Sequence, residues 1–383
     1  MTPDRLSLLA LLLLAAACGD DTAPTADQYP AVAVATTLDL GHPADYTRSS
    51  WPPFYTAQVL AQSNTPAGNP ITDRGATLGR VLFHDRHLSR NDTKSCASCH
   101  DQGRAFSDAA QFSLGFGGVE RTTAHSMRLA NARFYAAQEM FWDRRAPTLE
   151  AQATQPIRHA VEMGFDDEHG GIDSLLAKMQ GLAYYPELFA WVFGDSTITE
   201  DRIQRALAQY VRSIVSADSK FDRTYASAYN AAAPNGGILA PFPGFTEQEN
   251  LGKSLFLRPV NQGGAGCAGC HVPPTFALAA NSGSNGLDAG EFRTFKAPSL
   301  KDVGVTGPYM HDGRFTSLGQ VVGHYMRGVQ DGPALDDRLR GPGGAPQRLL
   351  FEPSEENAIV AFLLTLTDQS LPTDPRFTDP FRP

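Results

Sequence analysis

Cysteine is scarce in this chain, and no pair of cysteines is left over to form a disulfide. Four of the five cysteines belong to two short motifs, and the fifth is Cys18. Basic residues form no stripe and the formal net charge is −9, so nucleic acid is not an expected partner. The apolar run from Leu6 to Ala17 is too short to cross a bilayer as a helix. Few segments alternate as a strand requires, which favours a mainly α-helical fold.

The N-terminal apolar run follows Arg5, which is the arrangement of a signal peptide. Three alanines, Ala15 to Ala17, precede Cys18 and resemble the bacterial lipobox, although the usual leucine lies one position early, at Leu14. Residues 1–18 are therefore predicted to be a signal peptide of the lipoprotein type, with Cys18 as the lipid anchor. Ordinary cleavage nearby is the alternative, and in both cases the mature chain is expected in the periplasm.

Two copies of one pentapeptide pattern carry the clearest chemistry in the sequence. They are Cys96-Ala97-Ser98-Cys99-His100 and Cys267-Ala268-Gly269-Cys270-His271. The pattern C-x-x-C-H is typical of a covalently attached c-type haem, in which the cysteines form thioethers and the histidine ligates the iron. A structural zinc site is excluded, because the two cysteine pairs lie far apart in the sequence and a histidine follows each pair. We therefore expect two covalently bound haem c groups, on His100 and His271.

Helical periodicity recurs on both sides of these motifs. The expected helices span residues 74–83, 172–180, 186–193, 199–215, 247–256 and 354–366. Thr199 stands at the N-cap position of one of them, and Thr246 begins a capping box before another.

A six-residue pattern, L-G-[RK]-x-L-F, precedes each haem motif, at Leu78–Phe83 and at Leu251–Phe256. This repetition predicts a mainly α fold with two cytochrome-c-like helical domains, each binding one covalent c-type haem. The stretch 231–243 is rich in Pro, Gly and Ala and is the best candidate for the boundary. The expected organisation is a signal peptide at 1–18, a flexible tether at 19–45, an N-terminal haem domain at 46–235 and a C-terminal haem domain at 236–383.

Several further motifs occur in a specific order around the two haem sites. The segments are Leu78–His100, Ser113–Met163, Val211–Asp222, Leu251–His271 and Phe295–Gly328. The most specific are F-W-D-R-R-A at 141–146, P-I at 156–157, V-E-M-G at 161–164, K-A-P-S-L at 296–300 and G-P-Y-M-H-D-G-R-F at 307–315. In this order the chain resembles the bacterial dihaem cytochrome c peroxidase superfamily, and is closer to its MauG-like branch.

The resemblance implies unequal roles for the two haems. The haem on His100 would be the peroxidatic one, and the haem on His271 would transfer electrons. Glu162 stands at the position of the catalytic glutamate that moves a proton between the two peroxide oxygens. Gln152 matches a glutamine of the distal pocket, and Trp142 matches a tryptophan that relays oxidising equivalents between the haems.

Two positions depart from the pattern of many members of that superfamily. Phe116 stands where those members carry a histidine that ligates the peroxidatic iron, so the first haem should be open or hold only water. The distal ligand of the second haem falls at Tyr325, where those members have a methionine, and MauG-type proteins carry tyrosine at this place. A phenolate favours oxidised iron. Met326 and His324 are the alternative ligands.

The resemblance also implies a calcium ion between the domains, held in part by the carbonyl oxygens of Thr306 and Pro308. The family's asparagine donor corresponds to His125 in this chain. Arg144 and Arg145 could pair with haem propionates or be surface charges.

We therefore expect a periplasmic dihaem c-type peroxidase that reduces hydrogen peroxide with electrons from a small redox protein, a cytochrome c or a cupredoxin. The high-valent state would be shared between the two haems through Trp142. The first alternative is a MauG-like oxidase that modifies residues, such as tryptophan, of a partner protein. An alternative of another class is a non-catalytic dihaem electron carrier, against which Glu162 and Gln152 argue.

Overall fold

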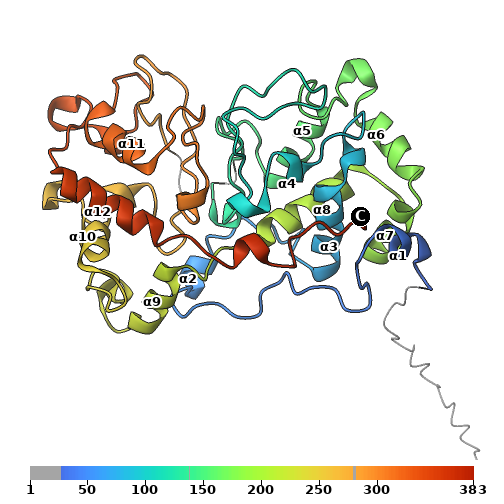
Figure 1. Ribbon diagram of the computed structural model, residues 1–383, viewed down its shortest axis with the longest axis horizontal. Coiled ribbons are helices and arrows are strands. Elements are labelled where there is room, and N and C mark those ends of the chain that lie inside the picture. The colour runs from blue at the N-terminus through green and yellow to red at the C-terminus, as the bar shows by residue number, and fades with distance from the viewer. Residues whose placement is uncertain (1–26, 138, 279–281) are drawn as a thin grey trace, which may run out of the picture.

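The computed structural model describes residues 27–137, 139–278 and 282–383, which form two helical lobes side by side (Figure 1). Within those ranges there are isolated β-bridges but no longer strand, so the expected mainly α fold is confirmed. The helices are α1 (Pro30–Ala35), α2 (Ala57–Leu60), α3 (Asp73–His84), α4 (Leu149–Ala153), α5 (Gln155–Arg158), α6 (Gly171–Gln180), α7 (Tyr184–Phe193), α8 (Glu200–Ser213), α9 (Lys220–Ala228), α10 (Glu247–Leu257), α11 (Leu318–Gly323) and α12 (Pro353–Leu364).

The repeated six-residue pattern lies on α3 in the first lobe and on α10 in the second, and each helix packs against one partner. The partner of α3 is α8, and the partner of α10 is α12. A Cβ atom at Gly79 would lie 2.1 Å from the carbonyl oxygen of Ala206, and one at Gly252 would lie 1.8 Å from that of Ala358. Only glycine permits such close crossings, which explains why this residue recurs in both copies.

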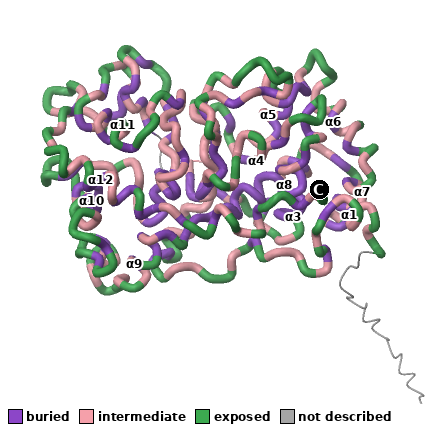
Figure 2. Tube along the Cα trace, in the orientation of Figure 1, coloured by how far each residue is buried: buried purple, intermediate pink, exposed green. Residues whose placement is uncertain are grey.

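Each lobe has its own apolar core, and the segments buried in these cores run through the interior of both lobes (Figure 2). The first core includes Phe83, Leu88, Tyr185, Phe189, Leu207 and Tyr210. The second includes Phe221, Phe242, Phe256, Phe276 and Phe362. Burial of each such side chain stabilises the fold by about 2 kcal/mol. A separate core beside each haem motif is what two haem domains require.

The predicted boundary between residues 235 and 236 is not where the chain changes lobe. Helix α9 belongs to the second core, where the Phe221 ring lies 5.0 Å from that of Phe276. In the opposite direction, the C-terminal segment returns to the first lobe (Figure 1), where Phe377 is buried in the first core. The Gln102 side chain donates to the carbonyl oxygens of Leu371 and Asp374, both at 2.9 Å. Periodicity fixes where a helix lies in the sequence but not which core it joins.

The expectation of a flexible tether at 19–45 is wrong for residues 30–45, which pack on the first lobe. Val32 in α1 is buried, and its N–H donates to the Glu187 carboxylate at 3.0 Å. Thr36 forms a β-bridge with Phe381 near the C-terminus. The predicted signal peptide and Cys18 lie outside the described residues. Within the ranges that the structure describes, each helix is too short or too polar to cross a bilayer.

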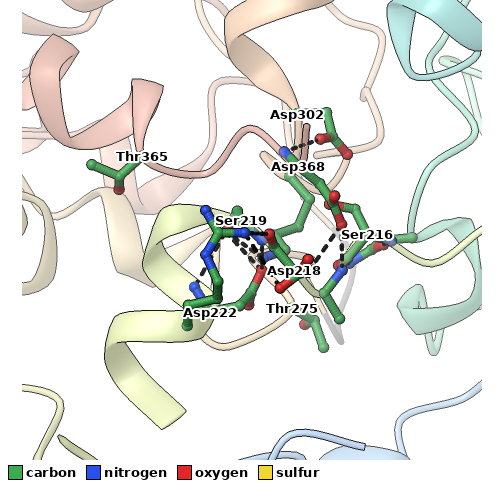
Figure 3. A network of polar contacts seen from close by, with 12 residues as sticks. Ser216, Asp218, Ser219, Asp222, Thr275, Asp302, Thr365 and Asp368 are labelled. Atoms are coloured by element: carbon green, nitrogen blue, oxygen red, sulfur yellow. Dashed lines mark hydrogen bonds and ion pairs between the residues drawn. The ribbon is translucent and has the colours of Figure 1, made fainter. Parts of the chain in front are cut away.

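A buried polar network joins α9 to the segments that lead into and out of the second core (Figure 3). Lys301, which has no exposed surface, forms an ion pair with Asp222, and the Asp222 carboxylate also accepts from the Ser219 hydroxyl at 2.7 Å. The neighbouring Asp302 accepts from the backbone N–H of Asp368 at 2.7 Å. Burial raises the pKa of Asp302 to about 7. This network fixes α9 in the second lobe.

Candidate dihaem site

The two motif histidines have the same local arrangement. The Nδ1 atom of His100 donates to the carbonyl oxygen of Phe106 at 2.9 Å, and that of His271 donates to the carbonyl oxygen of Pro298 at 3.1 Å. A histidine that donates through Nδ1 presents Nε2 as a neutral ligand to a metal. Burial lowers the pKa of both rings, that of His271 to about 4, which keeps the imidazoles neutral.

The motif cysteines start short 3₁₀ turns, Cys96–Ser98 and Cys267–Gly269. In each turn the backbone N–H of the following histidine donates to the first cysteine's carbonyl oxygen at 3.0 Å. All four cysteines are free and half-buried, so each thiol remains available for a bond to a haem. The sequence prediction of two equivalent attachment sites therefore fits this geometry.

A cavity in the second lobe opens over His271 and has the lining that a haem needs. Cys267, Cys270 and His271 lie on its wall, together with Tyr325 and Met326. Much of the remaining lining is apolar, and three segments that contribute to it are 295–300, 303–311 and 318–322. These residues fit a c-type haem attached to the second motif.

Two cations also line this cavity without a carboxylate partner among the described residues. Arg128 donates to the carbonyl oxygen of Ser299, and the Lys296 amine lies over the Tyr135 ring at 4.3 Å. Burial lowers the pKa of Arg128 to about 10 and that of Lys296 to about 7. Buried cations need compensating anions, which the propionates of a bound haem would supply. The spacing of the sequence motifs gave no indication that Arg128 and Lys296 line this cavity.

The three candidate distal ligands lie in one π-helical turn, His324–Gly328, directly after α11. His324 does not line the cavity, and its Nε2 atom lies 3.0 Å from the carbonyl oxygen of Asn285. Tyr325 and Met326 both line the cavity, and Met326 is also part of the second apolar core. Burial, together with the Cys270 thiol, raises the pKa of the Tyr325 phenol. The geometry therefore leaves Tyr325 and Met326 as the candidates.

Trp142 lies between the lobes and is held by both. Its indole N–H donates to the carbonyl oxygen of His125 at 2.7 Å, and its own carbonyl accepts from the Lys296 N–H at 2.8 Å. The indole also lines the cavity over His271. The flanking residues Phe141 and Arg144 have positive φ angles of 68° and 59°, so the loop is held in a sparsely populated conformation. This arrangement suits a tryptophan that relays charge between two haems.

In the first lobe, Glu162 and Phe116 come together from two loops. The Phe116 N–H donates to the carbonyl oxygens of Val161 and Glu162, at 3.1 and 3.2 Å. Burial raises the pKa of Glu162, and the positive charges of His159 and Arg145 oppose this shift. Burial raises the pKa of both cysteine thiols of the first motif, and the negative charge of Glu162 adds to that rise.

Gln152 lies on α4, and its side chain makes no hydrogen bond within the described residues. The position of α4 is fixed by an ion pair that periodicity could not reveal. Arg212 on α8, whose side chain is 1% exposed, contacts both carboxylate oxygens of Glu150, at 2.5 and 2.9 Å. An arginine on the buried face of a predicted amphipathic helix is a sign of such a partner.

The side chains around the expected calcium donors make other contacts. The Nδ1 atom of His125 faces the carbonyl oxygens of Ala110 and Gln111, and its Nε2 atom lies 3.3 Å from the Ser107 hydroxyl. The guanidinium of Arg128 donates to the Thr306 hydroxyl at 3.2 Å, which places a positive charge beside the proposed site. Among the described residues there is no cluster of three acidic, histidine or cysteine side chains that could hold a metal ion.

Two covalent attachment turns, two neutral imidazoles and a tryptophan between two helical lobes define a dihaem c-type cytochrome. Comparison with known proteins agrees. Residues 73–230 match the family model of the di-haem cytochrome c peroxidases. The chain is 31% identical over 319 residues to the methylamine utilization protein MauG of Methylophilus methylotrophus, covering 80% of this chain and 86% of that protein. It is 29% identical over 336 residues to the cytochrome c551 peroxidase of Nitrosomonas europaea, covering 82% of this chain and 87% of that protein.

The fold comparison gives the same result. A crystal structure of a MauG-like protein associated with microbial copper homeostasis superposes with a TM-score of 0.66 at 28% identity, covering 83% of this chain and 96% of that chain. The diheme peroxidase BthA from Burkholderia thailandensis superposes with a TM-score of 0.60 at 19% identity, covering 89% and 94%. This chain belongs to the di-haem cytochrome c peroxidase and MauG family, whose cofactors are two haem groups.

Proposed function

We propose that this chain is a peroxide-dependent dihaem oxidase of the MauG type, which passes the oxidising equivalents of hydrogen peroxide to residues of a partner protein. The observation that carries the proposal is the side chain beside Glu162. Phe116 has no atom that can ligate iron, and its backbone is hydrogen-bonded to the loop that carries Glu162. A site of this kind can bind peroxide without prior reduction.

When bound, the haem on His100 would supply the electrons that break the O–O bond of peroxide. Glu162 accepts a proton from the peroxide oxygen nearer the iron and returns it to the leaving oxygen. A raised pKa favours this exchange, because a carboxyl group that titrates nearer to neutral pH can take up and release the proton. Trp142 would carry charge between the lobes, and Tyr325 would help to hold the second haem.

The ferric protein mixed with hydrogen peroxide in a stopped-flow spectrometer tests this proposal. A rapid spectral change at both haems, without added reductant, is the expected result. A Glu162→Gln variant should react about 100-fold more slowly. If the ferric wild type is inert until it has been reduced, the site is not open and the proposal is wrong.

A second candidate is a peroxidase that consumes electrons from a small redox protein, and relatives named cytochrome c551 peroxidase favour it. The two functions differ in the fate of the oxidised state. A peroxidase should oxidise reduced cytochrome c or cupredoxin over many cycles. The MauG-type activity should turn over such donors slowly and leave a mass change on a tryptophan of the partner. A non-catalytic carrier would show neither outcome.

We propose further that the protein is periplasmic and anchored through a lipid on Cys18, on the evidence of the N-terminal sequence. Labelling cells with radioactive palmitate should mark the wild type but not a Cys18→Ser variant. Equal labelling of both, or of neither, would contradict the lipid anchor. Fractionation of the same cells tests the periplasmic location separately.

A further inference from the structure

The loop that carries Glu162 is organised around a single exposed residue, His159, at the C-terminal end of α5. The carbonyl oxygen of His159 accepts from the N–H groups of Met163 and Gly164, at 3.3 and 3.0 Å. Its ring Nδ1 atom accepts from the N–H groups of Val161 and Glu162, both at 3.3 Å. One residue therefore holds the turn that carries Glu162.

The same Nδ1 atom lies 3.7 Å from the Oε1 atom of Glu162. The His159 side chain is 49% exposed and that of Glu162 is 31% exposed, so the imidazole lies on the solvent side of the carboxyl. A proton taken from solvent onto this Nδ1 atom would replace its contacts with the Val161 and Glu162 N–H groups, and a small rotation of either side chain would then let the imidazolium donate that proton to the Glu162 carboxylate. Histidine exchanges protons readily near neutral pH, which makes this position suitable for passing protons inward.

The other charged side chains near His159 and Glu162 each form an ion pair with a carboxylate. Arg145 opposes the rise in the pKa of Glu162, and it forms an ion pair with Asp143 at 2.8 Å. Arg158, next to His159 in the chain, pairs with Glu200 at 2.8 Å. Of the two charged groups that act on Glu162, only His159 is of a residue type that exchanges protons readily.

The need for such a group follows from proton balance. Breaking the O–O bond of hydrogen peroxide forms the first water with the two hydrogens that the peroxide already carries. Forming the second water consumes two electrons, which the oxidised partner residue or donor supplies, and two protons. When the partner residue itself releases protons on oxidation, these appear outside the distal pocket. The protons for the second water must therefore reach the pocket from solvent.

We propose that His159 is the proton relay that recharges Glu162 from solvent while the second water forms. The inference rests on the proposed reaction with peroxide. His159 acts through Glu162 and also positions it. The cleavage step needs no proton from outside and does not depend on the relay. The reduction step consumes protons from solvent and therefore depends on it.

The experiment is double-mixing stopped flow on the holoenzyme: hydrogen peroxide first, then excess hydroquinone as a two-electron, two-proton reductant. The key variant is His159→Asn, because the Asn side-chain oxygen can accept from the Val161 and Glu162 N–H groups but cannot titrate. Cleavage should proceed at the wild-type rate in this variant, and the reduction step should slow about tenfold and lose its pH dependence between 5 and 8. Imidazole in the buffer should restore the reduction rate of a His159→Gly variant.

Arg158→Gln, a neighbouring change that leaves both groups of the relay in place, is the matched control and should keep both rates. If His159→Asn reduces at the wild-type rate with an unchanged pH profile, His159 only shapes the turn and the proposal is overturned. If instead cleavage slows and reduction does not, the residue positions Glu162 without relaying protons, which also overturns it. A wild type that is inert to peroxide would overturn the proposed function together with this inference.

Discussion

The ring of Phe116 lies directly against the backbone of Gly164. A Cβ atom built on Gly164 would come 2.4 Å from the Cζ atom of the Phe116 ring, and Gly164 has a φ of +83°. The glycine therefore provides both the space for the ring and the backbone conformation of the loop. Because the same loop carries Glu162, the side chain proposed to leave the iron open and the carboxyl proposed to move the proton are held in one packed unit.

A Phe116→His variant should close the open site. The backbone of residue 116 stays held, because its carbonyl accepts from the side chains of Asn91 and Thr93, both at 3.0 Å. An imidazole at this position can ligate the iron, so we expect a low-spin first haem that reacts with peroxide only after reduction. Electron paramagnetic resonance of the ferric protein measures the spin state. A Phe116→Leu control should stay high-spin, and a high-spin Phe116→His protein would contradict the assigned position of residue 116.

Changing Tyr325 to Phe should alter the low-spin spectrum of the second haem, because it removes the phenolate oxygen. A Met326→Leu change should leave that spectrum as it is and destabilise the fold by about 1 kcal/mol through altered packing in the second core. Magnetic circular dichroism distinguishes oxygen from sulfur ligation. Loss of a thioether band in Met326→Leu would instead make Met326 the ligand.

Calcium chelation should leave this protein unchanged. The Arg128 guanidinium lies beside Thr306, where the family resemblance places the ion, and it brings a positive charge of its own. We expect less than one calcium per chain by elemental analysis, and no change in the haem spectra after treatment with EGTA. An Arg128→Gln variant should shift the spectrum of the second haem, whereas Thr306→Val should have little effect. Stoichiometric calcium that EGTA removes, with a change in the spectra, would contradict this prediction.

Asp302 should make stability fall as pH rises. Its pKa in the folded chain is about 7, above the ordinary value of 3.8, so between these pH values the folded state binds more protons than the unfolded state. The stabilisation from the protonated carboxyl is therefore complete below about pH 4 and is lost as pH rises through 7. Asp302→Asn should raise the free energy of unfolding at pH 8 by about 1 kcal/mol or more, and have less effect at pH 5.

Urea denaturation of the holoenzyme at the two pH values measures the effect of Asp302. An Asp201→Asn variant is the control, since that carboxyl is 74% exposed. A destabilisation by Asp302→Asn at pH 8 would mean that the folded chain stabilises the ionised carboxylate, and it would contradict this prediction.

Local features of the fold were predictable because they depend on neighbours in the sequence. The predicted helix at 172–180 lies within α6, and Thr199 and Thr246 cap α8 and α10 as expected. The haem attachment turns were also visible, since each is one pentapeptide.

Features that depend on distant partners were not predictable in this way. The return of the C-terminal segment and the Arg212–Glu150 ion pair join residues far apart in the sequence. His159 carries no motif of its own, and its role emerges only when its ring is seen beside Glu162. Arg128 and Lys296 likewise become informative only once the cavity over His271 is defined.

The return of the C-terminal segment also has a consequence for biosynthesis. Leu371 and Phe377 complete the core of the lobe that holds His100, although that lobe is otherwise made of residues synthesised early. The first lobe therefore cannot reach its final packing until the last residues of the chain are in place. The two lobes of this protein therefore depend on each other to fold. A fragment that ends after α12 would lack part of the core of the first lobe.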